Sequence, residues 1–136
     1  MKPEKNLVVS GKRKTSIAKA TIKAGTGKVT INKKDMKNLD FLKNLEIKEP
    51  LEIAKSVLGE LKFDIVVNVK SGGHASQNEA ARLSIARAIV EFTKSDELRQ
   101  AYLAYDRNLL IADTRRKEAY KPDDSKARAK RQTSYR

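Results

Sequence analysis

The sequence has no cysteine and no tryptophan, and its 136 residues include a single histidine, His74. The absence of cysteine excludes disulfide bonds, thiolate nucleophiles and thiolate zinc sites, and it fits a reducing compartment. One histidine without a second histidine or a cysteine does not indicate a metal site, and the spacing of serines and aspartates does not indicate a catalytic triad. We therefore expect no metal and no other cofactor.

Long apolar runs are missing as well. No stretch approaches the twenty apolar residues of a membrane-spanning helix, and the N-terminus lacks a signal-peptide pattern. We therefore expect a cytoplasmic protein without a membrane partner. The acidic residues of the central part are scattered among lysines and share no predicted face, so no catalytic pair of carboxylates is indicated. We expect no enzymatic activity.

Positive charge is in excess and is unevenly distributed. The formal net charge is +13. Residues 1–34 hold ten Lys or Arg and one acid, residues 35–113 hold eleven against thirteen acids, and residues 114–136 hold nine against three. A nearly neutral centre between two basic ends indicates a folded body that presents cations to a partner dense in negative charge.

The length and the apolar pattern indicate one domain with an extension. A chain of 136 residues with 39% hydrophobic content can build one core of ordinary size but not two. The apolar periodicity ends near Ile111. We predict a globular domain over residues 1–113 and an extended basic tail over 114–136, and we expect the domain to fold without the tail.

The tail lacks the apolar residues needed for a core, so a partner must order it. Its alanines allow the backbone to approach a phosphate surface, and its tyrosines can stack on exposed bases. The run from Pro122 to Ser125 favours a single helical turn. The alternative is a solvated, disordered basic segment. The candidate RNA-binding residues of the tail are Arg115, Arg116, Lys117, Lys121, Lys126, Arg128, Lys130 and Arg131.

Alternation of apolar and polar residues predicts strands in the first third of the chain. Residues 6–24 read as two strands interrupted by the polar run 11–14, and the second strand has one buried and one basic face. The glycines in 25–27 favour a hairpin turn into a third strand around Val29 and Ile31. We predict an antiparallel three-stranded start.

The remaining elements follow from turn and capping signals. Pro50 and Gly59 predict a helix over about 50–58, and strict alternation over 61–69 predicts the clearest strand of the chain. The Ser-x-x-Glu pattern of residues 76–79 predicts the capping box of a long helix, and Ser95 predicts the cap of a second helix.

A basic surface is predicted on the N-terminal strands. The candidate RNA-binding residues here are Lys12, Arg13, Lys14, Lys19 and Lys28, and Lys23 extends the same surface. Cations also protect exposed sheet edges from aggregation, which is the alternative explanation. Edge protection does not need so many cations on successive strands, so phosphate contacts explain the pattern better.

The glycine-containing loop before the long helix is a weaker candidate. Free backbone N–H groups and the positive end of a helix dipole favour a phosphate at Gly72, Gly73 and His74. The loop lacks the Lys-Ser/Thr pair of a nucleotide-binding P-loop, and a tight strand-to-helix turn would use the same residues. We interpret it as such a turn that also contacts an RNA phosphate.

Four stretches together resemble a known family. They are GKRKTSIAKATIKAGTGKVTIN (11–32), GGHASQNEAARLSIARAIV (72–90), DTRRKEAYKP (113–122) and the terminal Ser134-Tyr135-Arg136. In this order they resemble the S-nine family of small ribosomal subunit proteins over nearly the whole chain. Ser71-Gly72-Gly73 stands where bacterial members have three glycines, and Ser-Tyr-Arg stands for Ser-Lys-Arg. With residues 98–110, these differences resemble the archaeal and eukaryotic branch.

The resemblance implies a two-layer α+β fold, ribosomal S-five domain-two-like, with the order β-β-β-α-β-α. It also implies a left-handed β-α-β crossover, whereas general topology rules predict a right-handed one. It implies a structural role in the head of the small subunit, on ribosomal RNA beside proteins seven, ten and fourteen. The tail is then expected to reach peptidyl-site transfer RNA through Tyr135 and Arg136. Two alternatives are an enzyme, since small-molecule kinases share this fold and a glycine-rich loop, and a DNA-compacting protein.

Overall fold

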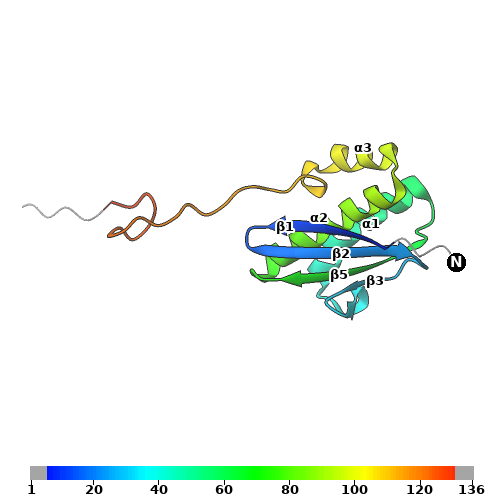
Figure 1. Cartoon of the computed structure of the whole chain (residues 1–136), viewed down its shortest axis with the longest axis horizontal. Coiled ribbons are helices and arrows are strands. Elements are labelled where there is room, and N and C mark those ends of the chain that lie inside the picture. The colour runs from blue at the N-terminus through cyan, green and yellow to red at the C-terminus, as the bar shows by residue number, and fades with distance from the viewer. Residues whose placement is uncertain (1–5, 131–136) are drawn as a thin grey trace, which may run out of the picture.

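The computed structural model describes residues 6–130, which begin with a tight antiparallel hairpin (Figure 1). β1 (Leu7–Arg13) and β2 (Ser16–Ala24) pair from Leu7↔Ile22 to Arg13↔Ser16. Only Lys14 and Thr15 separate the strands, and Lys14 has a positive φ of 52°. The predicted interruption over residues 11–14 is therefore wrong. Gly11, Lys12 and Arg13 form the end of β1, because the turn needs just two residues.

The third strand does not join this hairpin. β3 (Val29–Ile31) pairs in parallel with β5 (Phe63–Lys70), and β5 pairs antiparallel with β2. A two-residue strand, β4 (Lys34–Asp35), pairs with the outer side of β3, so the sheet order is β1-β2-β5-β3-β4. The predicted antiparallel three-stranded start is wrong, because β5 lies between β2 and β3.

Asp64 on β5 explains why residues 25–27 do not form a hairpin turn. Its Oδ1 accepts hydrogen bonds from the backbone N–H groups of Thr26 (2.9 Å), Gly27 (3.1 Å) and Lys28 (2.9 Å). These bonds, first that from Lys28 and then that from Thr26, lower the pKa of Asp64 below its ordinary value. The loop is thus fixed to β5 and leads the chain to the far side of that strand.

Helices cover one face of the sheet (Figure 1). They are α1 (Phe41–Leu58), α2 (His74–Thr93) and α3 (Asp96–Tyr105), with the 3-10 turns η1 (Met36–Asn38) and η2 (Arg107–Leu109). The elements follow one another as β1, β2, β3, β4, α1, β5, α2 and α3, so the structure has β4 and α3 beyond the six elements that the resemblance implies. The coarse prediction of an α+β fold is confirmed by the mixed sheet and its helices.

The helix that contains Pro50 is longer than predicted. Pro50 lies inside α1 and not at its start, although proline removes one backbone donor from a helix. The site is buried, and the hydroxyl of Tyr102 on α3 donates a hydrogen bond of 2.7 Å to the Pro50 carbonyl. Burial also raises the pKa of Tyr102. Tertiary contacts thus stabilise a proline that local rules place at a helix end, while Gly59 ends α1 as predicted.

The long helix begins two residues before the predicted cap. Gly73 is the N-cap of α2, and the Ser76 hydroxyl, three positions into the helix, bonds both the N–H and the carbonyl of Gly73. The predicted capping box of residues 76–79 is wrong because Glu79 pairs with Arg13 instead. The Ser95 cap of α3 is confirmed, since its hydroxyl accepts a bond of 3.3 Å from the Leu98 N–H.

The core lies between the sheet and the helices, and small residues occupy the place where α2 lies closest to β1 and β2. Gly11, Ala18 and Ala20 on the strands meet a side of α2 formed by Ala80, Ala81, Ser84 and Ala88. A Cβ at Gly11 would lie 2.6 Å from the Ala80 carbonyl oxygen and 2.7 Å from the Ser84 backbone nitrogen. The absence of a side chain at Gly11 therefore sets how closely the strand lies against the helix.

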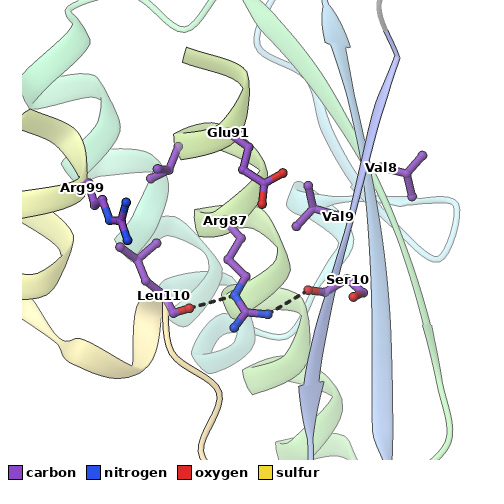
Figure 2. Close-up of a pocket in the computed structure, with 8 residues that line it drawn as sticks. Val8, Val9, Ser10, Arg87, Glu91, Arg99 and Leu110 are labelled. Carbon is purple, nitrogen blue, oxygen red and sulfur yellow. Dashed lines mark hydrogen bonds between the residues drawn. The ribbon is translucent and has the colours of Figure 1, made fainter. Parts of the chain in front are cut away.

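Arg87 of α2 links β1 to the segment that follows η2 (Figure 2). Its guanidinium donates to the Leu110 carbonyl through Nε at 2.8 Å and to the Ser10 carbonyl through Nη1 at 3.3 Å. The groove around it has a volume of about 450 Å³ and runs between β1, α2 and the segment after η2. Arg87 thus fixes the place where the chain leaves the body.

Beyond Ile111, the described part of the chain contains no helix and no strand and extends away from the body (Figure 1). The helical turn predicted at residues 122–125 is wrong. In its place is a simple turn in which the Asp124 N–H donates to the Lys121 carbonyl at 3.4 Å, and Asp123 has a positive φ of 65°.

Candidate nucleic-acid interface

The face of the sheet opposite the helices is open and basic. Register places Lys12, Ile17 and Lys70 in one row across β1, β2 and β5, and Ser10, Lys19 and Asn68 in the next. All six side chains are exposed, as is Lys23 farther along β2. The predicted basic face is confirmed for Lys19 and Lys23. Lys70 was missed, although the alternation of its strand places it on this face.

This open face also carries exposed Val8, Ile17 and Val66 but no aromatic ring on its described strands. Asp64 of β5 also faces this side, but its carboxylate already accepts hydrogen bonds from the backbone of the loop at residues 26–28. Lys28 directly precedes β3 and forms an exposed ion pair with Asp35 at 3.6 Å. Because exposed ion pairs contribute little free energy, a phosphate can displace Asp35 from Lys28 at small cost.

A second basic surface forms where the hairpin turn meets the start of the tail. We call it the turn–tail concavity; its volume is about 710 Å³, and it is lined by Arg13, Lys14, Thr15, Arg115, Arg116 and Lys117. Residues a hundred positions apart in the sequence thus lie together. The sequence identified these cations separately, but only the fold shows that they line one surface.

Two of these cations are already paired. Arg13 contacts Glu79 of α2 and, at 3.5 Å, Asp113, and it donates a bond of 3.4 Å to the Arg115 carbonyl. Arg115 contacts Asp113 at 2.7 Å. The hydrogen bonds from Arg115, first from its side chain and then from its backbone, lower the pKa of Asp113 to about 2. No local pattern in the sequence predicts this role for Asp113.

The glycine-containing loop is tightly packed. Gly72 has a φ of 73°, and a Cβ there would lie 2.0 Å from the Ser16 hydroxyl oxygen. That hydroxyl donates to the Ser71 carbonyl and shares a bond with Ser76, each at 2.8 Å. The loop is therefore the strand-to-helix turn that was predicted. Gly72, Gly73 and His74 are exposed, and their contact with RNA stays a prediction.

Farther along, the tail contains local charge contacts. The ammonium group of Lys117 lies 4.5 Å from the centroid of the Tyr120 ring, and Arg128 contacts Glu118 at 2.9 Å. Lys121, Lys126 and Lys130 are exposed, whereas Ala127 is buried and does not present a small surface to a partner. The predicted contacts of Arg131, Tyr135 and Arg136 lie outside the described residues.

The model of a family described as "Ribosomal protein S9/S16" matches residues 11–136 of the chain. The chain belongs to this ribosomal protein family. It is 45% identical over 130 residues to the small ribosomal subunit protein uS9 of Methanococcus vannielii, covering 93% of this chain and 95% of that protein. The protein of the same name from Methanococcus maripaludis strain C5 is 46% identical over the same shares of the two chains. The resemblance noted from the sequence is thereby confirmed.

Membership of the S9/S16 family makes the protein a structural component of the small ribosomal subunit, in the cytoplasmic ribosome and in translation. The expectation that it is not an enzyme is confirmed, and the kinase and DNA-compaction alternatives are set aside. Within residues 6–130, no three His, Cys, Asp or Glu side chains are grouped as metal ligands. The helices that the structure describes are too short or too polar to cross a membrane.

Proposed function

We propose that the protein binds ribosomal RNA in the head of the small subunit through its open sheet face and its turn–tail concavity. The observation that carries this proposal is the convergence of hairpin and tail cations on one concavity. Cations held on a rigid hairpin lose less conformational freedom on binding than cations on a free tail. The family supplies the setting, since its members belong to the small subunit.

The chemistry of the open face favours contacts with the RNA backbone. Lysines reach phosphates without reading bases, and the described strands place no ring on this face for a base to stack on. The exposed valines and Ile17 can pack against the sugars. Gly72, Gly73 and His74 are proposed as further phosphate contacts at the start of α2.

The tail is proposed as a separate functional segment. The body comprises residues 1–113, and residues 114–136 extend toward peptidyl-site transfer RNA, with Tyr135 and Arg136 closest to it. The guanidinium of Arg136 is suited to a charge-assisted contact with phosphate. Neighbours in the head are proposed to be proteins seven, ten and fourteen. The body is proposed to share the S-five domain-two-like fold, with a left-handed β3-α1-β5 crossover.

The proposal is tested by replacing three lysines of the open face, Lys12, Lys19 and Lys70, with glutamine in one variant. A matched control replaces three exposed lysines on the helical side, Lys48, Lys55 and Lys94. Binding to a folded head fragment of small-subunit RNA is measured across a salt titration. The slope of log affinity against log salt is expected to fall by up to roughly 2.7 in the first variant, at about 0.9 for each phosphate that is no longer neutralised. Equal slopes for both variants would remove the open face from the interface.

A further inference from the structure

One acidic side chain, Asp113, contacts two of the cations that line the turn–tail concavity, Arg13 and Arg115. Asp113 precedes Arg115, Arg116 and Lys117, and its carboxylate sits beside Arg13 at the turn–tail concavity. A carboxylate repels phosphate, so a surface selected for charge alone would not contain it. The Asp113 side chain is only 14% exposed, which shows that the carboxylate faces the protein and not the solvent.

We propose that Asp113 is a positioning residue for an RNA phosphate bound in the turn–tail concavity. This inference rests on the function proposed above and adds a site, its ligand group and the residue that organises it.

Both oxygens of the Asp113 carboxylate are used by its neighbours. Oδ2 accepts from Arg115 Nη2 at 2.7 Å and Nε at 2.9 Å, and Oδ1 accepts from the Arg115 backbone N–H at 3.0 Å. The bond to the backbone fixes the chain direction as well as the side chain. The pKa of Asp113 is lowered to about 2, so the carboxylate stays ionised and keeps these contacts in mildly acidic solution as well as at neutral pH.

Arg13 connects Asp113 and Arg115, which together with Arg13 form what we name the Asp113 cluster, to the body. Its guanidinium contacts Asp113 on one side and Glu79 of α2 on the other, and it donates to the Arg115 carbonyl. The start of the tail is therefore held against β1 through a single side chain that also reaches α2. With only 12% of its side chain exposed, Arg13 is a structural connector and not a free cation.

Three cations remain for a ligand. Lys14 in the hairpin turn and Arg116 and Lys117 in the tail are exposed and line the concavity from its two sides. A phosphate suits them because it offers several acceptor oxygens to donors from different directions. The Asp113 cluster orders the tail side of the site before the RNA arrives, so that binding does not have to meet this ordering cost.

The substitution Asp113→Asn separates the positioning role from the effect of charge, because the two predict opposite changes in RNA affinity. Removing an acid raises the net charge by one, so charge alone predicts tighter RNA binding. Positioning predicts that affinity falls by roughly five- to thirtyfold, the equivalent of fixing one more residue on binding. Asp113→Glu keeps the charge but displaces the carboxylate, so positioning predicts a loss here too and charge predicts no change.

The matched control is Glu118→Gln, which removes an acid from an exposed ion pair in the same tail. It is expected to bind RNA as tightly as the wild type or more tightly. Trypsin cleavage of the free protein after Arg115, Arg116 and Lys117 is expected to speed up in Asp113→Asn but not in the control. Thermal unfolding of the body is expected to stay cooperative in both variants.

A third variant makes failure of the site distinguishable from failure of the proposed function. Replacing Lys14, Arg116 and Lys117 together with glutamine is expected to weaken RNA binding and flatten its salt dependence. If this variant binds normally, the concavity holds no phosphate and drops out of the proposed interface, while the open-face lysine variant still decides whether the sheet face binds RNA. If it binds weakly but Asp113→Asn binds as well as the wild type, the site stands and the positioning role of Asp113 is wrong.

Discussion

Replacing Gly11 with alanine adds one methyl group at the point where β1 lies on α2. The added carbon would meet the Ala80 carbonyl oxygen at 2.6 Å and the Ser84 backbone nitrogen at 2.7 Å. Ordinary van der Waals contacts of a Cβ lie at 3.4–4 Å, so both new contacts are too short by at least about 0.7 Å. Both opposing atoms belong to the helix backbone and cannot rotate away as a side chain would.

Relief of this overlap requires α2 to move off the sheet, which opens the packing of Ala81, Ile85 and Ala88 against the strands. Overpacking of a close-packed core costs about 1–3 kcal/mol. Because only backbone can yield, we expect a loss near the top of that range, about 3 kcal/mol. This outweighs the gain of about 0.4–1 kcal/mol that alanine brings by restricting the unfolded chain.

The assay is thermal unfolding followed by circular dichroism. A loss of about 3 kcal/mol is expected to lower the midpoint by roughly 10–15 °C for a domain of this size. The matched control is Gly73→Ala, because a Cβ at Gly73 would meet nothing within 4 Å. Its midpoint is expected to fall by no more than about a few degrees, because Gly73 is the N-cap of α2, where alanine is less favourable than glycine. An unchanged midpoint for Gly11→Ala would show that β1 and α2 are not in close contact and would refute the account of the core.

Two further predictions concern Asp64 and the end of the chain. Because the folded state lowers the pKa of Asp64, its carboxylate stabilises the protein above the ordinary aspartate value of about 3.9, and this contribution is lost as the pH falls through the lower folded value. Asp64→Asn is therefore expected to reduce the midpoint at pH 7 and to flatten its fall below about pH 4, and parallel profiles for the two proteins would contradict this. Deleting Tyr135 and Arg136 is expected to leave subunit assembly intact while transfer RNA dissociates from the peptidyl site up to about a hundredfold faster, and equal dissociation rates at low and high salt would exclude the contact.

Local patterns were sufficient where an element is decided by its own residues. The alternation around Ile65 and Val67 predicts β5, the spacing of Ile85 and Ile89 predicts the buried side of α2, and Ser95 predicts the cap of α3. In each case burial of one face or one capping bond determines the structure. The structure therefore has these elements where the local patterns predict them.

Local patterns failed where a distant residue decides the outcome. The loop at residues 25–28 has hairpin composition, but a carboxylate from β5 holds it in another path. Pro50 has the signature of a helix start, but a hydroxyl from α3 and burial keep it inside α1. The sequence was sufficient to recognise the candidate cations as a basic set. Their grouping into a turn–tail concavity depends on the contact between Arg13 and Asp113, which are far apart in the sequence.

The place of β5 between β2 and β3 also constrains the order in which the sheet can form. The β1–β2 hairpin closes over a two-residue turn and needs only neighbouring residues. β3 has just the two residues of β4 beside it until residues 63–70 have been synthesised and have paired with β2. Closing such long loops before any contact is gained slows folding. The sheet therefore cannot be completed before β5, which is its central strand and the last strand in the sequence, has been synthesised.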